Sequence, residues 1–129
     1  MITRAFPNLL CPVPTDLAPF YETLLDFQHN FSADWFILLE DKENPDVTLG
    51  LLQQDHGSVP QSLSKTPSGQ IITFVVPDCD VIHDRLQAMS HTPLTTPTDM
   101  EYGQRRMLVK DPIGAVIDIS APTAAMPGR

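Results

Sequence analysis

Hydrophobic and polar residues alternate along much of this chain with the two-residue period of β-strands. The alternating stretches are 2–12, 35–40, 47–53, 70–77 and 103–120, with shorter ones near 29–32 and 93–98. Successive side chains of a strand point to opposite faces, so each stretch can bury one face and expose the other. The pattern predicts a protein rich in short strands.

Two stretches have the helical period instead. The first carries an apolar stripe with the spacing i, i+3, i+4, i+7, i+8, made by Leu17, Phe20, Tyr21, Leu24 and Leu25. In the second, the stripe consists of Ile82, Leu86 and Met89, and Asp78 is placed to cap the first turn. Such stripes are typical of helices that cover one face of a sheet. We therefore expect two helices, each beginning after a strand.

The stretch 103–120 predicts an antiparallel hairpin. Asp111-Pro112-Ile113-Gly114 has the residues that a type I turn accepts most readily. A four-residue turn at this point would pair Lys110 with Ala115. It would then pair Met107 with Asp118, and Arg105 with Ser120.

That register would divide the side chains of the hairpin between two faces. The core face would hold Leu108, Ile117 and Ile119. The other face would hold Arg105, Met107, Val109, Val116 and Asp118. Because the second set combines apolar residues with a carboxylate and a guanidinium, it would border water or line a cavity.

The two halves of the chain repeat one order, strand, helix and three strands. Val13-Pro14-Thr15 is answered by Val76-Pro77-Asp78, and FILLED at 36–41 by MLVKD at 107–111. A unit of about fifty residues that cannot bury both sheet faces must pair with its copy. We expect a single domain over 1–129, divided into module one at about 1–53, a linker loop at 54–69, module two at about 70–120 and a tail at 121–129.

Composition narrows the classes of partner. The chain has 129 residues, 42% of them hydrophobic, and 8 basic against 16 acidic residues give a net charge of −8. This charge disfavours binding to nucleic acid and to anionic membranes. Because no apolar run approaches the roughly 18 residues of a membrane span, we expect a cytoplasmic protein with no membrane partner. Cys11 and Cys79 lack the spacing of a redox pair, so we expect both to be reduced and buried.

Three segments together resemble a known superfamily. They are FYETLLDF at 20–27, ITFVVPDCD at 72–80 and YGQRRMLVKDPIGAVIDI at 102–119. Their order and spacing are similar to those of the vicinal oxygen chelate proteins, which include glyoxalase I, bleomycin-resistance proteins and extradiol dioxygenases. The resemblance implies an α+β fold of paired βαβββ modules, in which a curled mixed sheet forms a cup with the helices on its outer face. It also implies a homodimer.

In the metal-dependent members, four inward positions of the first and fourth strands supply His, Gln or Glu ligands. Counting along the resembling segments places these positions on Phe6, Leu49, Ile71 and Asp118. Only the last of them is an acid, and one carboxylate does not hold a divalent ion. We therefore expect no metal and no other cofactor.

The remaining inward positions define the predicted ligand-binding face. By analogy with the second hairpin, alternate residues from Trp35 onward would face the cup in module one. The complete predicted set is Phe6, Asn8, Trp35, Ile37, Leu39, Leu49, Ile71, Thr73, Arg105, Met107 and Asp118. Such a lining is typical of a small-molecule site, although the same residues could fill the core or form a dimer seam. Asp118 could hold a cationic group of the ligand or form an ion pair with Arg105.

The function that we predict is metal-independent binding of a small molecule by a homodimer, of the resistance or sequestration type, with cationic and aromatic compounds as candidates. A lyase, isomerase or dioxygenase of the same superfamily is the first alternative. It would use metal-free acid–base chemistry or an atypical ligand set of Asn8, His56, Gln70 and Asp118. A small structural or regulatory dimer without a ligand is the second alternative.

Overall fold

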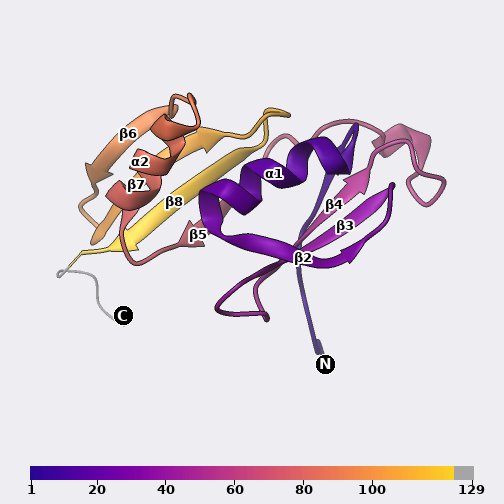
Figure 1. Ribbon diagram of the computed structural model, residues 1–129, viewed down its shortest axis with the longest axis horizontal. Helices are drawn as coiled ribbons and strands as arrows, with labels where there is room; N and C mark the ends of the chain where they lie inside the picture. Colours follow the sequence, from indigo (N-terminus) through magenta and orange to yellow (C-terminus); the bar gives the residue numbers. More distant parts are fainter. Residues whose placement is uncertain (124–129) are drawn as a thin grey trace. The chain divides into compact units, whose positions relative to one another are not determined.

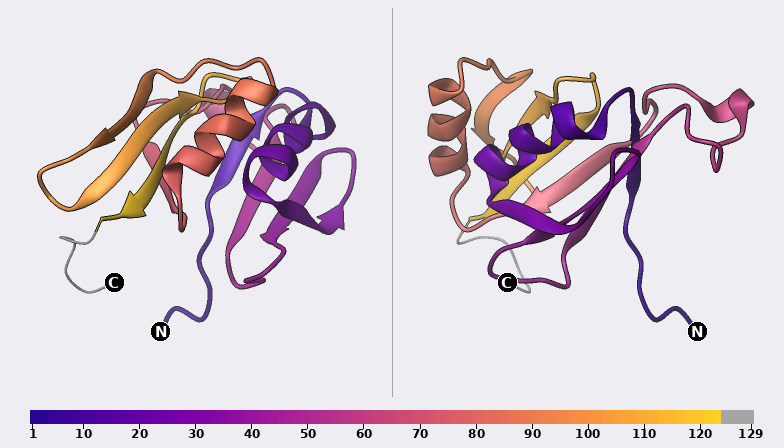
Figure 2. Two further views of the ribbon diagram at one scale, coloured as in Figure 1. Left: turned by 60° about the vertical axis from the view of Figure 1, so that its left-hand side comes forward. Right: turned by 45° about the vertical axis from the view of Figure 1, so that its right-hand side comes forward.

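The computed structural model describes residues 1–123, so most of the predicted tail lies outside the described residues. The chain divides into two compact units, Met1–Pro67 and a second one that begins at Ser68. Each unit has one four-stranded sheet with one α-helix along one of its faces (Figures 1 and 2). No helix in the described part of the chain is long and apolar enough to cross a membrane.

The first unit contains sheet A. Its elements are β1 (Asn8–Cys11), α1 (Pro14–Leu25), β2 (Phe27–Ser32), β3 (Phe36–Asp41), β4 (Thr48–Gln53) and a short 3-10 helix at Gln61–Leu63. The strand order is β1-β4-β3-β2, with β1 parallel to β4 and the other pairs antiparallel.

The second unit contains sheet B and repeats the arrangement of the first. Its elements are β5 (Ile71–Val75), α2 (Cys79–Ala88), β6 (Thr95–Asp99), β7 (Gln104–Lys110) and β8 (Val116–Pro122). The strand order is β5-β8-β7-β6, with β5 parallel to β8. Both units are therefore βαβββ modules, and the predicted order of elements is confirmed.

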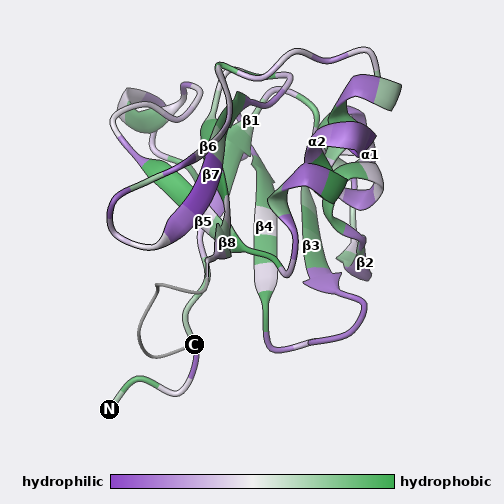
Figure 3. Ribbon diagram, turned by 90° about the vertical axis from the view of Figure 1, so that its left-hand side faces the viewer, coloured by the Kyte–Doolittle hydropathy of each residue, from purple (hydrophilic) through white to green (hydrophobic). Residues whose placement is uncertain are grey.

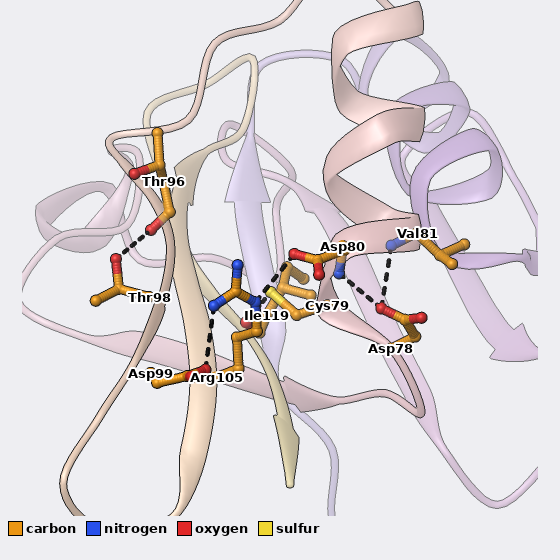
Figure 4. A network of polar contacts seen from close by, with 9 residues as sticks. All are labelled: Asp78, Cys79, Asp80, Val81, Thr96, Thr98, Asp99, Arg105 and Ile119. Carbon is orange, nitrogen blue, oxygen red and sulfur yellow. Dashed lines mark hydrogen bonds and ion pairs between the residues drawn. The ribbon is translucent and has the colours of Figure 1, made fainter. Parts of the chain in front are cut away.

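The start of each helix follows from local sequence. Pro14 occupies the first turn of α1, where its missing N–H leaves no hydrogen bond unmade, and Asp26 in the left-handed conformation (φ 58°) ends the helix. At α2 the Asp78 carboxylate accepts hydrogen bonds from the backbone N–H groups of Asp80 at 2.9 Å and Val81 at 3.4 Å (Figure 4). The predicted Asp78 cap is confirmed.

Equivalent rows of residues show that the internal repeat extends to the strand register. One row crosses the core of each sheet: Leu9, Leu51 and Ile37 in sheet A, and Phe74, Ile119 and Met107 in sheet B. In hydropathy colouring β3 and β4 are largely hydrophobic, whereas β7 has a hydrophilic stretch (Figure 3). The repeat preserves the buried face of the module and lets the other face vary.

Two polar contacts identify the face of each sheet that its helix covers. His29 of β2 lies opposite Leu39, and its Nε2 is 3.0 Å from Glu22 Oε1 on α1. Arg105 of β7 donates through Nε to Asp80 Oδ1 on α2 at 3.0 Å (Figure 4). The face that includes Leu39 is therefore under α1, and the face that includes Arg105 is under α2.

The hairpin β7–β8 differs from the predicted register by one residue. The type I turn is present, because Gly114 N–H donates to the Asp111 carbonyl at 3.0 Å. However, Gly114 has φ +88° and Asp111 N–H donates to the Ala115 carbonyl, which is the three-residue loop with a G1 bulge. Asp111 lies opposite Ala115 as a result, and the predicted Lys110–Ala115 pair is wrong.

The slip changes every pair along the hairpin. Lys110 pairs with Val116, Leu108 with Asp118, and Arg106 with Ser120. Because side chains alternate, a shift of one residue moves a whole strand to the other face relative to its partner. The predicted grouping of Arg105, Met107 and Val109 with Asp118 is wrong.

The boundaries of two other elements also differ from the sequence prediction. The first strand is shorter than the predicted stretch 2–12, beginning only at Asn8. Ala121 and Pro122, predicted to begin the tail, belong to β8, and Thr123 N–H donates to the Gly103 carbonyl at 2.9 Å.

Candidate functional site

The face of sheet B that α2 does not cover, here called the helix-free face of sheet B, has Asp118 at its centre. Three rows cross strands β5, β8 and β7 on this face: Ile71–Val116–Lys110, Thr73–Asp118–Leu108 and Val75–Ser120–Arg106. Neighbouring strands lie about 4.8 Å apart, so each member of a row contacts the next. The grid surrounds one carboxylate with both polar and apolar side chains.

Three side chains contact the Asp118 carboxylate, those of Ser120, Thr73 and Arg106. We call these four residues the Asp118 cluster. Ser120 Oγ donates to Oδ1 at 2.6 Å, and Thr73 Oγ1 donates to Oδ2 at 3.3 Å. Arg106 Nη2 lies 3.4 Å from Oδ2, and the Asp118 side chain is 10% exposed. Burial in a medium of low dielectric strengthens such contacts. The cluster is an internally paired group rather than a free carboxylate.

Arg105, predicted as the partner of Asp118, has other partners. Its Nε is 3.0 Å from Asp80 Oδ1 and its Nη1 is 3.1 Å from Asp99 Oδ1 (Figure 4). Hydrogen bonds to Asp80 and then to Asp99 raise the pKa of Arg105 above its ordinary value. The predicted Arg105–Asp118 pair is wrong, because the register puts Arg106 on the side of Asp118.

Apolar side chains of β5 flank the Asp118 cluster. Ile71 is 53% exposed and Val75 is 46% exposed, whereas Ile117 and Ile119 in the core of the same sheet are completely buried. Leu108, beside Asp118 in the middle row, is half-buried. The helix-free face of sheet B therefore combines accessible apolar surface with a few polar groups that have fixed positions.

In sheet A the equivalent central position is Gly50, which lies between Asn8 and Leu38 in its row. A Cβ atom at Gly50 would lie 3.0 Å from both Asn8 Cγ and Phe36 Cε1 and closer still to Asn8 Oδ1. The Asn8 side chain thus lies over the glycine, in the space that a carboxylate at this position would occupy. Gly50, and not the predicted Leu49, is the counterpart of Asp118.

An aromatic group lies beside the helix-free face of sheet A. Trp35 stacks on His56 with ring centroids 4.0 Å apart and an interplanar angle of 13°. Phe36 contacts Trp35 at 5.8 Å and Phe31 at 6.2 Å between centroids. His56 Nδ1 accepts from Ser58 N–H at 3.2 Å, and the stacking on Trp35 holds the start of the predicted linker loop beside β3.

The predicted site residues separate into three groups. Those on the helix-free faces are Asn8, Ile71, Thr73 and Asp118. Those on the helix-covered faces, where the prediction is wrong, are Ile37, Leu39, Leu49, Arg105 and Met107. Phe6 and Trp35 lie outside the strands: Trp35 immediately precedes β3, and Phe6 is two residues before β1, with the Arg4 guanidinium 4.8 Å from the centre of its ring.

Sequence reasoning missed Arg106 and Leu108, which the observed register places on the helix-free face of sheet B, and it left Val75 and Ser120 out of the site. The signal that could have found Arg106 and Leu108 is the glycine at the fourth position of DPIG. A glycine after a type I turn commonly adopts the left-handed conformation and adds the residue that shifts the register. That single correction would have exchanged Arg105 for Arg106.

Neither helix-free face has a donor set that fits a divalent metal ion. In sheet A the central neighbours are Asn8 and Gly50, which include no carboxylate. In sheet B they are Thr73 and Asp118, and both Asp118 oxygens already accept hydrogen bonds. Within residues 1–123 no three His, Cys, Asp or Glu side chains gather closely enough to hold a metal. Metal-dependent chemistry of the superfamily type has no ligand set at these positions.

The two cysteines are buried and have no disulfide. Cys79 Sγ donates to the Ile119 carbonyl at 3.5 Å, and burial, followed by the charge of Asp80, raises the pKa of the Cys79 thiol to about 11. A thiol with so high a pKa is protonated at neutral pH and is a poor nucleophile. The predicted reduced state agrees with this geometry.

A line of polar groups, Glu22, His29 and Ser32, lies at the edge of sheet A beside α1. His29 contacts Glu22 through Nε2 and Ser32 through Nδ1. A β-bulge after His29 brings Ser32 to the same side of the strand. A Ser–His–Glu arrangement needs free N–H donors nearby if it is to stabilise a negatively charged oxygen during catalysis. The adjacent Ala33 N–H already donates to the Phe36 carbonyl, so it does not provide such a donor.

The fold and the site together define a class of protein, the α+β proteins built from two βαβββ modules. Residues 9–119 match the family model described as Glyoxalase/Bleomycin resistance protein/Dioxygenase superfamily. The chain belongs to this superfamily, and the predicted resemblance is confirmed. None of the curated proteins matches the chain.

Solved structures have the same fold. A structure described as a conserved domain protein is 26% identical, with a TM-score of 0.78, covering 95% of this chain and 100% of that one. A glyoxalase/bleomycin resistance protein/dioxygenase from Nocardioides is 22% identical, with a TM-score of 0.75, covering 100% of this chain and 89% of that one. A lactoylglutathione lyase from Agrobacterium tumefaciens is 13% identical, with a TM-score of 0.73, covering 94% and 95%. These likenesses support the paired-module fold.

Proposed function

We propose that this protein binds a small molecule with an apolar or aromatic body, without a metal ion, on the helix-free face of sheet B. The observation that carries the proposal is the half-exposed pair Ile71 and Val75 beside the buried Asp118 carboxylate. Sites for small molecules are mostly apolar, with a small number of placed polar groups that orient the ligand. Half-exposed apolar side chains keep part of their surface in contact with water, and a ligand that covers them removes this contact, which is favourable.

The charge of the ligand need not be positive. Cationic compounds are candidates from the sequence because Asp118 could hold a cationic group, but Arg106 lies 3.4 Å from its carboxylate. An ion pair at this distance largely cancels the local negative charge. Specificity in this proposal comes from the apolar platform of Ile71, Val75 and Leu108 and from the hydrogen-bonding groups beside it.

The test introduces a charge into the platform and compares it with the same charge elsewhere. Val75 on β5 and Val81 on α2 are each 46% exposed, so they form a matched pair. We expect Val75→Glu to abolish the binding of small aromatic compounds measured by calorimetry, and Val81→Glu to leave it unchanged. Equal affinities in the two variants, both with native unfolding curves, would contradict the proposed site.

A further inference from the structure

Arg106 is the poorly paired member of two neighbouring arginines. Its guanidinium has two long contacts, from Nη2 to Asp118 Oδ2 at 3.4 Å and from Nη1 to the Tyr102 hydroxyl at 3.5 Å. Its Nε is shielded from solvent and has no hydrogen-bond partner among residues 1–123. Arg105, by contrast, makes ion pairs at 3.0 and 3.1 Å.

Burial makes this difference informative. The Arg106 side chain is 23% exposed and that of Arg105 is 37% exposed, so the more buried arginine has the weaker contacts. A shielded donor without an acceptor is unfavourable, and such donors in folded proteins call for an explanation. A ligand that supplies acceptor oxygens is one that fits the surroundings of Arg106.

Asp118 does not depend on Arg106 for its hydrogen bonds. Ser120 donates a hydrogen bond to Oδ1, and Thr73 donates one to Oδ2. If the guanidinium turned toward a ligand, the carboxylate would keep both of these donors. The guanidinium can therefore turn toward a ligand while each buried Asp118 oxygen keeps a hydrogen-bond donor.

The strand register sets the size of the ligand. Val75, Ser120 and Arg106 form one row across β5, β8 and β7, and two strand spacings separate the outer members by about 10 Å. That span matches a compact acid whose apolar body rests on Val75 while its carboxylate reaches Arg106. Arg presents paired N–H groups in the fork geometry that suits a carboxylate.

We propose that Arg106 recognises the carboxylate of a small apolar or aromatic acid bound on the helix-free face of sheet B. This inference rests on the function proposed above and names its ligand class. The net charge of −8 opposes such a ligand only weakly, because repulsion from exposed charges more than about 8 Å away is largely screened at physiological salt. The local donors determine which ligand is preferred.

The experiment compares three probes of one shape, 3-phenylpropionate, 3-phenylpropionamide and 3-phenylpropylamine. We expect the acid to bind most tightly by calorimetry and the amine most weakly. Arg106→Gln should weaken the acid by about tenfold or more, because hydrogen bonds to charged groups are the strong ones. The amide should lose much less, and the matched control Arg105→Gln should bind the acid as the unaltered protein does.

A second measurement keeps the test valid if Arg106→Gln does not fold. In the unaltered protein, the ¹⁵N–¹H signal of Arg106 Nε should shift when 3-phenylpropionate is added, and that of Arg105 should not. A stationary Arg106 signal during saturable binding, or equal affinities for acid and amide, would overturn the role of Arg106 and leave the proposed function standing. Failure of all three probes to bind would overturn both.

Discussion

Gly50 positions a polar side chain by having none of its own. It occupies the centre of the helix-free face of sheet A, as Asp118 does in sheet B, and the Asn8 side chain lies across it. The two modules therefore share a buried face but differ at the same central position. One centre carries a carboxylate held by hydroxyl groups, and the other carries a carboxamide lying over bare backbone.

Replacement of Gly50 should test this contact directly. We expect Gly50→Ala to lower the free energy of unfolding by about 1–3 kcal/mol, because the added methyl group displaces Asn8 and the Phe36 ring. The matched control is Gly57→Ala, since nothing lies within 4 Å of a Cβ atom at Gly57. Urea unfolding of both variants measures the difference, and equal stabilities would show that Asn8 does not need the glycine.

At the scale of elements, the hairpin loop decides which side chains reach the site. The stretch Asp111–Gly114 was correctly predicted as a type I turn, yet Gly114 adds one residue in the left-handed conformation. The order of elements and both apolar stripes could be predicted, because periodicity survives small errors in position. The sheet face to which each side chain points could not be predicted, because a shift of one residue exchanges Arg105 for Arg106 beside Asp118.

The analogy between the two modules carried the wrong choice of face from the second module into the first. Ile37 and Leu39 were assigned to the ligand face because they correspond to Met107 and Val109, and that correspondence is correct. All four are completely buried on the helix-covered faces. The repeat was therefore identified correctly, while the inward direction was taken from a hairpin whose register was shifted.

Gly114 should be intolerant of a side chain for reasons of backbone conformation. Its φ of +88° is one that residues with a Cβ atom rarely adopt, although nothing crowds the position. We expect Gly114→Ala to destabilise the protein by about 1 kcal/mol, measured by chemical unfolding. Gly114→Asn should cost less, because asparagine tolerates the left-handed region better, and the reverse order would contradict the bulge.

At the scale of the whole molecule, superfamily membership does not determine the chemistry. A solved structure of the same fold is described as a lactoylglutathione lyase. In this chain the centre of sheet A has Asn8 and Gly50 and no carboxylate, and the centre of sheet B has one, Asp118, beside Thr73. Fold and chemistry are separable, because a change of a few side chains on a conserved scaffold alters function. The homodimer stays a prediction.

Metal binding can be tested on the whole folded chain, since any ligand of the native state raises its stability. At a free metal concentration 100 times the dissociation constant, a metal site would add about 2.7 kcal/mol to the free energy of unfolding. Because both Asp118 oxygens are engaged by hydroxyl groups, we expect zinc, nickel, manganese and iron(II) each to leave the melting temperature unchanged. Asp118→Asn separates a specific site from weak attraction to the acidic surface, since the variant keeps nearly all of the net charge of −8. A rise in melting temperature that Asp118→Asn abolishes would place a metal at the centre of sheet B and favour the enzyme alternative, whereas a rise of equal size in both proteins would reflect surface charge alone.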